Sequence, residues 1–198
     1  MNATTASSII HSPSASRRSF MRAGGTLSAV AVSLLAGNQA LAAGMKGDMS
    51  KDVSILNVAL ALEHEAINAY QLGAGSGLLE KPVLDIAVGF QGHHKAHRDA
   101  LIATIQKLGG TPVAEQKIEV YAESLKAGTL KTQADVLALA ARLELGATNA
   151  YLGVIPAFGD SELAKVAGRL AADETMHYTV LISALGRPLP AGALSFGA

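Results

Sequence analysis

Two segments of this chain repeat each other, and this repeat limits the possible folds more than any other feature. LEHEAINAYQLG begins at Leu62 and LELGATNAYLGV begins at Leu143, and they share Leu, Glu, Ala, Asn, Ala and Tyr in the same order. A second related pair, GHHKAHRDALI and ADETMHYTVLI, aligns His97 with His177. The sequence therefore predicts two halves built on one plan.

Apolar residues recur with the 3.6-residue period of an α-helix in four segments. The pattern predicts helices over Asp52–Leu72, Pro82–Leu108, Gln133–Ile155 and Ser161–Leu185. Short turns join the helices within each half, whereas residues 111–131 form a long connection between the halves. Two antiparallel hairpins joined by a long crossover indicate an all-α fold, a four-helix bundle.

The first 42 residues differ from the rest of the chain. They contain three arginines and no acidic residue, and a small-residue A-x-A pattern ends at Ala42. The basic part, SRRSFMR, resembles the twin-arginine export signal, which implies that Arg17 and Arg18 bind the export machinery. The alternative is an ordinary secretory leader. We therefore expect a cleaved signal peptide and a periplasmic or otherwise exported mature protein.

The expected organisation has four parts: a signal peptide over 1–42, a short linker over 43–51, the bundle over 52–186 and a tail over 187–198. The chain has 16 basic and 16 acidic residues and no cysteine. This balance argues against a nucleic-acid partner, and the lack of cysteine excludes disulfides and Cys-ligated metals. No stretch of the mature chain predicts a membrane span. Homo-oligomerisation is left open.

Polar side chains interrupt the predicted apolar stripes near the middle of each helix. Steps of three and four residues keep them on the core-facing side. Unpaired buried carboxylates are costly, and a divalent metal offsets that cost while also using imidazole ligands. The pattern predicts a metal site formed by Glu63, His94, His97, Glu144, Glu174 and His177.

These residues, taken in chain order, resemble the ferritin-like superfamily, and within it an exported branch related to desiccation-associated proteins. In that superfamily, two helices each supply a Glu and two supply Glu-x-x-His. The resemblance implies terminal ligation by Glu63 and Glu144, a bridging carboxylate at Glu174, and one imidazole anchoring each metal. It also implies iron as the cofactor, with manganese, zinc or copper as alternatives.

One position departs from that pattern, because His94 stands where the superfamily has a bridging Glu. A neutral imidazole has one free lone pair, so we expect Glu174 to be the bridging candidate. An asymmetric two-metal site, a single metal and a degenerate site all stay open. The added nitrogen favours iron, copper, zinc or other later metals over magnesium and calcium.

Neighbouring residues have plainer interpretations. Glu65 is expected to face away from the site and His93 to lie at its rim or on the surface, whereas His64 is expected either on the surface or behind the ligands. Tyr70 and Tyr151 are expected to fill core space. The resemblance implies a metal-dependent oxidoreductase acting on dioxygen or peroxide. The alternatives are a non-enzymatic stress or envelope-protection protein and a metal-sequestering protein.

Overall fold

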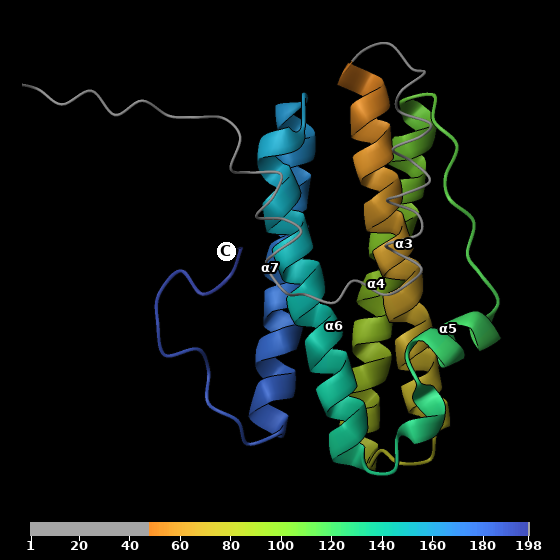
Figure 1. Ribbon diagram of the computed structural model, residues 1–198, viewed down its shortest axis with the longest axis vertical. Coiled ribbons are helices and arrows are strands. Elements are labelled where there is room, and N and C mark those ends of the chain that lie inside the picture. The colour runs from red at the N-terminus through yellow and green to blue at the C-terminus, as the bar shows by residue number, and fades with distance from the viewer. Residues whose placement is uncertain (1–47, 198) are drawn as a thin grey trace, which may run out of the picture.

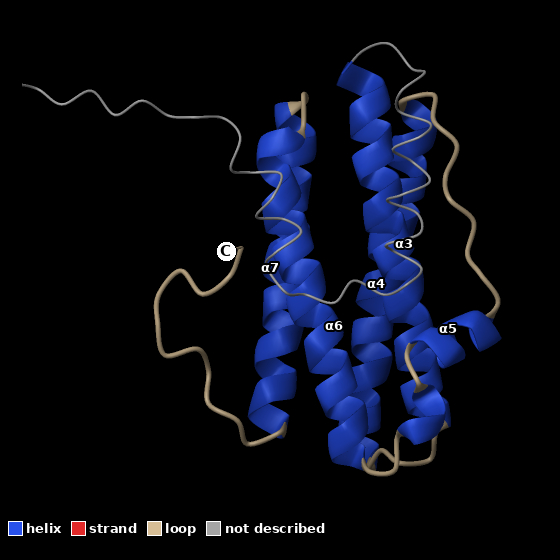
Figure 2. Cartoon of the chain, in the orientation of Figure 1, coloured by secondary structure: helices blue, strands red, loops and turns tan. Residues whose placement is uncertain are grey.

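The computed structural model describes residues 48–197, and this part of the chain contains helices and no strand. Figure 1 shows the long helices aligned along one axis, and Figure 2 shows that loops connect them. The long helices are α3 (Asp48–Gly75), α4 (Lys81–Lys107), α6 (Gln133–Val154) and α7 (Ser161–Ala184). The predicted all-α four-helix bundle is confirmed.

Two hairpins make up the bundle. Helix α3 packs along α4, and α6 packs along α7, whereas α3 and α6 contact each other less extensively. The connection between the hairpins contains the short helix α5 (Ile118–Ser124) and the 3-10 turn η1 (Ala127–Thr129), and a second 3-10 turn, η2 (Ile155–Ala157), follows α6. Helix α5 lies against α3. The long crossover therefore covers the outer side of the first hairpin.

Local signals set the ends of these helices. Thr132 and Asp135 form a capping box at the start of α6, and Asp160 caps α7 by accepting a hydrogen bond from the Glu162 amide. After α4 and α7, Gly109 and Gly186 adopt positive φ, a conformation that glycine reaches without strain. These ends lie within a few residues of the prediction.

The first helix is longer than predicted at both ends. It begins at Asp48, so the last part of the expected linker is helical, and it continues past Leu72 to Gly75. Gly73 lies buried against α6, where an added Cβ would come within 2.9 Å of the Val136 side chain. Packing against α6 thus extends the helix through a glycine-rich segment that the sequence predicted as a break.

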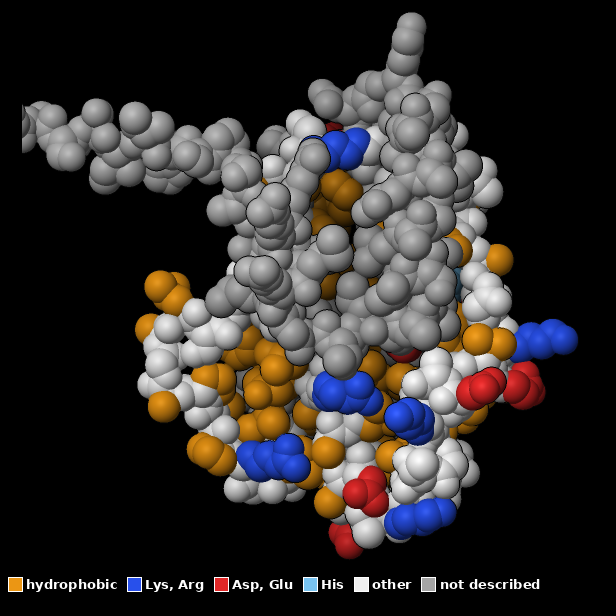
Figure 3. Space-filling view, viewed as in Figure 1, with side chains coloured by type: hydrophobic (Ala, Val, Ile, Leu, Met, Phe, Trp, Pro, Cys, Tyr) orange, Lys and Arg blue, Asp and Glu red, His pale blue; other side chains and the backbone are white. Residues whose placement is uncertain are grey.

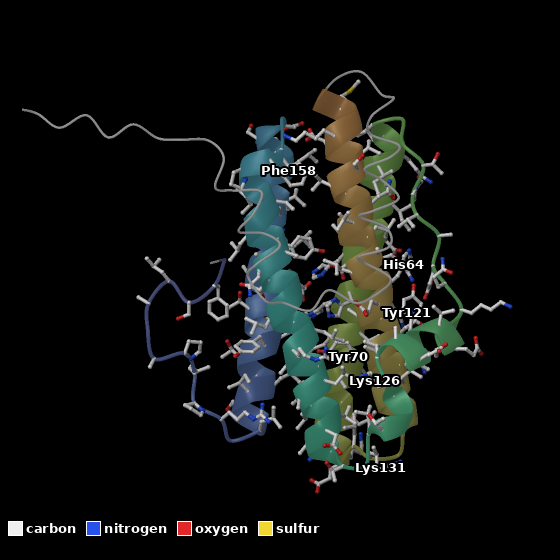
Figure 4. All side chains as sticks on the ribbon, in the orientation of Figure 1. His64, Tyr70, Tyr121, Lys126, Lys131 and Phe158 are labelled. Carbon is white, nitrogen blue, oxygen red and sulfur yellow. The ribbon has the colours of Figure 1, made fainter. Side chains whose placement is uncertain are left out.

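Two apolar layers enclose the middle of the bundle. One layer includes Leu60, Leu101 and Ile105, and the other includes Leu137 and Leu181. Figure 4 shows that the layers lie at different levels of the bundle, with Phe158 in the first layer and Tyr70 in the second. The predicted site residues lie between the two layers.

The apolar period of residues 161–185 predicts that Val166 faces the core, and this prediction is wrong. Val166 is 39% exposed, and the neighbouring Ala167 is buried instead. Leu163, Ala167 and Leu170 form the buried stripe of α7 at this level. The small Ala167 side chain suits the close approach of α6 and α7, and the larger Val166 points outward.

The C-terminal segment leaves the end of α7 and runs beside the second hairpin (Figure 1). Its end contacts the bundle, because the Phe196 ring packs edge-on against Tyr178 and the Gly197 amide donates to Asn149. Leu189 and Leu194 are exposed, and Figure 3 shows apolar side chains gathered on this lower part of the visible face.

The expected signal peptide lies outside the described residues. No helix within residues 48–197 has the length and apolar character needed to cross a bilayer.

Candidate metal centre

The six predicted site residues converge in the interior of the bundle. They come from all four long helices, and each is buried, with at most 8% of its surface exposed. They form two groups in which one ligand atom of every member lies within 4.8 Å of the others. The first group is Glu63, His94, His97 and Glu174; the second is His94, Glu144, Glu174 and His177.

His94 lies at the centre and belongs to both groups. Its Nδ1 is 2.8 Å from Oε2 of Glu63, and its Nε2 is 3.2 Å from Oε1 of Glu144. Glu174 is the other shared residue, with Oε1 3.7 Å from Nδ1 of His94. His94 therefore presents one ring nitrogen to each half of the centre.

The histidines of the two Glu/His-x-x-His motifs complete the two groups. Nδ1 of His97 lies 3.3 Å from Oε1 of Glu174 and 3.6 Å from Oε1 of Glu63. On the other side, Nδ1 of His177 lies 3.2 Å from Oε2 of Glu174 and 3.4 Å from Oε2 of Glu144. Glu174 thus contacts a histidine on each side, the arrangement expected of a bridging carboxylate.

The carboxylates and imidazoles shift each other's pKa values. Burial by itself raises the pKa of Glu63, but hydrogen bonds from His94 and His97 outweigh it and lower that pKa to about 2. Burial lowers the pKa of His97, but hydrogen bonds to Glu174 and Glu63 raise it to about 10. The same balance raises the pKa of His94 well above its usual value. Without a metal, imidazolium protons neutralise the buried carboxylates.

Glu174 behaves differently from the other two carboxylates. Burial raises its pKa to about 7, although hydrogen bonds from His177 and His97 act in the opposite direction. The pKa of Glu144 is lowered, because hydrogen bonds from His177 and His94 overcome the effect of burial. Glu174 is thus the carboxyl group that holds a proton most readily.

Two tyrosines connect the halves reciprocally. The Tyr70 hydroxyl of α3 donates to Glu144 of α6, and the Tyr151 hydroxyl of α6 donates to Glu63 of α3. We predicted that these tyrosines only fill core space, and they do belong to the apolar layers. Their hydroxyl groups also fix the orientation of two candidate ligands. The shared N-A-Y sequence was the signal for this role.

The ring nitrogens of His97 and His177 that point away from the centre also have partners. Nε2 of His97 lies 3.2 Å from Oδ2 of Asp173, and Nε2 of His177 lies 2.9 Å from Nδ1 of His93. His93 and Asp173 occupy equivalent positions of the repeat, directly before His94 and Glu174. His93 is exposed, as expected, but it contacts the centre as well.

Three buried polar atoms of the centre, Nδ1 of His97, Oε2 of Glu144 and Oε1 of Glu174, lie 3.3–3.4 Å from a group of opposite charge but form no well-aligned hydrogen bond with it. Buried polar groups in proteins are normally paired. All three atoms face the cluster, and carboxylate oxygen with imidazole nitrogen is a donor set that suits iron, manganese and zinc. The residues present fit a divalent transition metal.

His64 and Glu65 lie outside this centre, although both are buried. Of the two places predicted for His64, the surface is wrong, because the side chain is buried. Nε2 of His64 lies 3.2 Å from the Val113 carbonyl, and Asn68 donates to Glu115 of the same crossover. The crossover buries a face of α3 that the sequence pattern alone assigns to solvent.

Comparison with known proteins agrees with the fold. The ferritin-like domain family matches residues 51–187, and the chain belongs to this family. A crystal structure of a conserved hypothetical protein, rv2844, from Mycobacterium tuberculosis is similar, with a TM-score of 0.58 and 24% sequence identity. The similarity covers 74% of this chain and 99% of that chain. A search of curated proteins finds no match.

Proposed function

We propose that this protein binds a divalent transition metal, iron foremost, at the Glu–His centre and acts as an oxidoreductase on dioxygen or peroxide. The observation that carries the proposal is the pair of buried donor groups that share His94 and Glu174. Each group offers two carboxylates and two imidazoles. Imidazole ligands favour iron, zinc or copper over magnesium and calcium.

The residues of the chain have separate roles in this proposal. Glu63 with His97, and Glu144 with His177, would hold the metal on the two sides, and Glu174 would bridge them. When bound, iron or manganese supplies two-electron redox chemistry. The Tyr70 and Tyr151 hydroxyl groups hold Glu144 and Glu63 in place, and the surrounding apolar layers exclude bulk water.

Metal binding must displace protons from this centre. The pKa of His97 is raised to about 10 and that of His94 well above its usual value, so these two imidazoles carry protons in the metal-free protein near neutral pH. A ligand nitrogen must lose its proton before it binds a metal. Affinity for the metal should therefore rise with pH.

The test is metal analysis of protein isolated from the exported fraction, followed by ferroxidase and peroxidase assays. Two irons or manganeses per chain with turnover support the proposal, and the absence of both metal and turnover contradicts it. Glu174→Gln should abolish metal retention. Glu162→Gln is the matched control, because this residue lies on the same helix with an exposed side chain.

His94 supports a second candidate function, a non-enzymatic protein with one metal or none. Both of its ring nitrogens already bond to carboxylates, so its protonated form neutralises part of the charge that two metals would neutralise. Such a protein would serve stress or envelope protection or sequester metal. One zinc or copper per chain without turnover would favour sequestration, and a metal-free exported protein would favour the protective role.

We also propose that the protein reaches the periplasm, or another exported location, by the twin-arginine route. The support is the SRRSFMR sequence around Arg17 and Arg18. That route carries folded proteins, which suits a metal centre assembled before export. Replacing both arginines with lysine should leave the protein inside the cell, whereas replacing Arg22 alone should have a smaller effect.

A further inference from the structure

An apolar cavity lies beside the candidate metal centre, in the half of the bundle that contains the end of α3 and the start of α6. Its volume is about 40 Å³, and almost all of its surface is apolar. The walls come from all four long helices. They include Val83, Ala87, Leu137, Ala140 and Leu181.

Tyr70 connects this cavity to the centre. Its side chain forms part of the cavity wall. Its hydroxyl donates to Glu144, and its ring lies 5.4 Å, centroid to centroid, from the ring of His94. A molecule in the cavity is therefore separated from two candidate ligands by a single side chain.

Size and polarity limit what the cavity can hold. A volume of 40 Å³ exceeds the roughly 10–15 Å³ that one water needs, but a buried water also needs about two to four polar partners, which these walls lack. An engineered apolar cavity of about 150 Å³ stays dry and accepts benzene or xenon. This smaller cavity suits an apolar molecule below the size of benzene.

Small side chains leave the space open. The alanines Ala66 and Ala69 of α3 and Ala140 of α6 line it, and these two helices contact each other less extensively than the helices within each hairpin. A larger residue at any of these positions would fill the space. The cavity thus depends on a few small residues near the join between the hairpins.

We infer that this cavity is a binding site for a small apolar molecule and that its ligand is dioxygen. The choice of dioxygen rests on the proposed function, because Tyr70 and Glu144 place the cavity next to the centre where dioxygen would react. The existence of the site rests on the cavity alone. The two inferences can therefore fail separately.

The direct test uses dissolved dioxygen as the probe and paramagnetic relaxation of methyl protons as the readout. The metal-free full chain is measured by NMR under nitrogen and under oxygen pressure. Methyl groups of Leu137 and Leu181 should relax several-fold faster with oxygen than those of Leu60 and Ile105, which are at least as deeply buried in the other apolar layer. An equal oxygen-induced increase in methyl relaxation in the two apolar layers would overturn the inference.

A variant with a larger side chain in the cavity provides a second test. Ala140→Leu should remove the excess relaxation at Leu137 and Leu181, whereas Ala134→Leu, at an exposed position of the same helix, should leave it unchanged. Persistence of the excess in Ala140→Leu would also overturn the site. If that variant does not fold, the comparison of methyl groups in the unaltered chain still decides. Oxygen localisation in a protein that retains no metal would uphold the cavity and refute the proposed function.

Discussion

Nδ1 of His93 lies 2.9 Å from Nε2 of His177, so that an exposed side chain of α4 contacts a fully buried side chain of α7. The two rings are also stacked, with centroids 5.1 Å apart. His177 uses its other nitrogen toward Glu144 and Glu174. His93 therefore fixes which ring nitrogen of His177 faces the centre, and it does so from the protein surface.

Substitution of His93 tests this role. His93→Ala removes the partner of His177 and should weaken metal binding by about tenfold, the lower end of the range for residues that orient metal ligands. His93→Asp should retain the affinity, because Asp173 supports His97 in the same way in the other half. Competition with a chelator measures both. Equal affinities for the alanine variant and the original chain would contradict the role.

The tyrosine pair gives a second prediction. Tyr70→Phe and Tyr151→Phe each remove one hydroxyl donor to a candidate ligand, Glu144 or Glu63, and keep the ring. Each should weaken metal binding by about tenfold, and by similar factors, because the two contacts are equivalent. Tyr178→Phe is the control, since Tyr178 contacts Phe196 outside the centre. A similar loss in the control would show that the effect is not specific.

A third prediction concerns the central imidazole. His94→Glu gives both halves the same Glu-x-x-His motif. It also replaces an imidazole with a raised pKa by a carboxylate, whose negative charge attracts a metal cation. The variant should bind two metals per chain and retain the second more tightly than the original protein. Metal content after dialysis measures this. A lower metal content than in the original chain would show that His94 is a required ligand.

The metal-free protein should become less stable as the pH rises above the mildly acidic range. Its folded form binds protons more tightly than the unfolded form at Glu174, whose pKa rises from 4.5 to about 7, and at His97, whose pKa rises from 6.5 to about 10. Stability from these groups is lost as the pH increases through those windows. Thermal unfolding in a chelator measures the change. A Tm that stays constant or increases between pH 6.5 and 10 would contradict this.

At acidic pH the dependence reverses. The pKa of Glu63 falls from 4.5 to about 2 on folding, so its contribution is present above pH 4.5 and is lost as the pH decreases toward 2. The same unfolding experiment should therefore show a decrease in Tm below pH 4.5. Glu63→Gln should reduce that decrease.

The crossover provides a stability prediction away from the centre. The Asn57 side chain donates to the Thr111 carbonyl and accepts from the Val113 amide. Asn57→Ala should cost about 1 kcal/mol per lost hydrogen bond and increase hydrogen exchange at Val113. Gln116→Ala, at an exposed crossover position, should change neither. Unchanged exchange at Val113 would show that other contacts hold the crossover.

The sequence was sufficient to predict the bundle and the burial of six polar side chains inside it, because both follow from local periodicity. Glu63, His97 and Glu174 interrupt apolar stripes at helical spacing, and a stripe on one helix must face the others. A repeat also implies that equivalent residues lie at equivalent depths. Val166 was misassigned to the core, because the adjacent Ala167 is also apolar.

Contacts between distant segments could not be predicted in this way. The repeat indicates that Tyr70 and Tyr151 are equivalent, but it does not indicate that each contacts the Glu of the other half. His64 is buried because the crossover passes over it, and helical periodicity carries no information about that segment. The extension of α3 to Gly75 likewise depends on Val136 of another helix.

Each donor group takes ligands from both hairpins, with Glu174 reaching the first and His94 reaching the second. Neither half of the chain contains all the ligands of a donor group. A metal ion bound at the centre would therefore crosslink two hairpins that otherwise make few contacts with each other. Metal binding and the association of the two hairpins would then stabilise each other. An isolated half of the protein should bind metal no better than a peptide with scattered histidines.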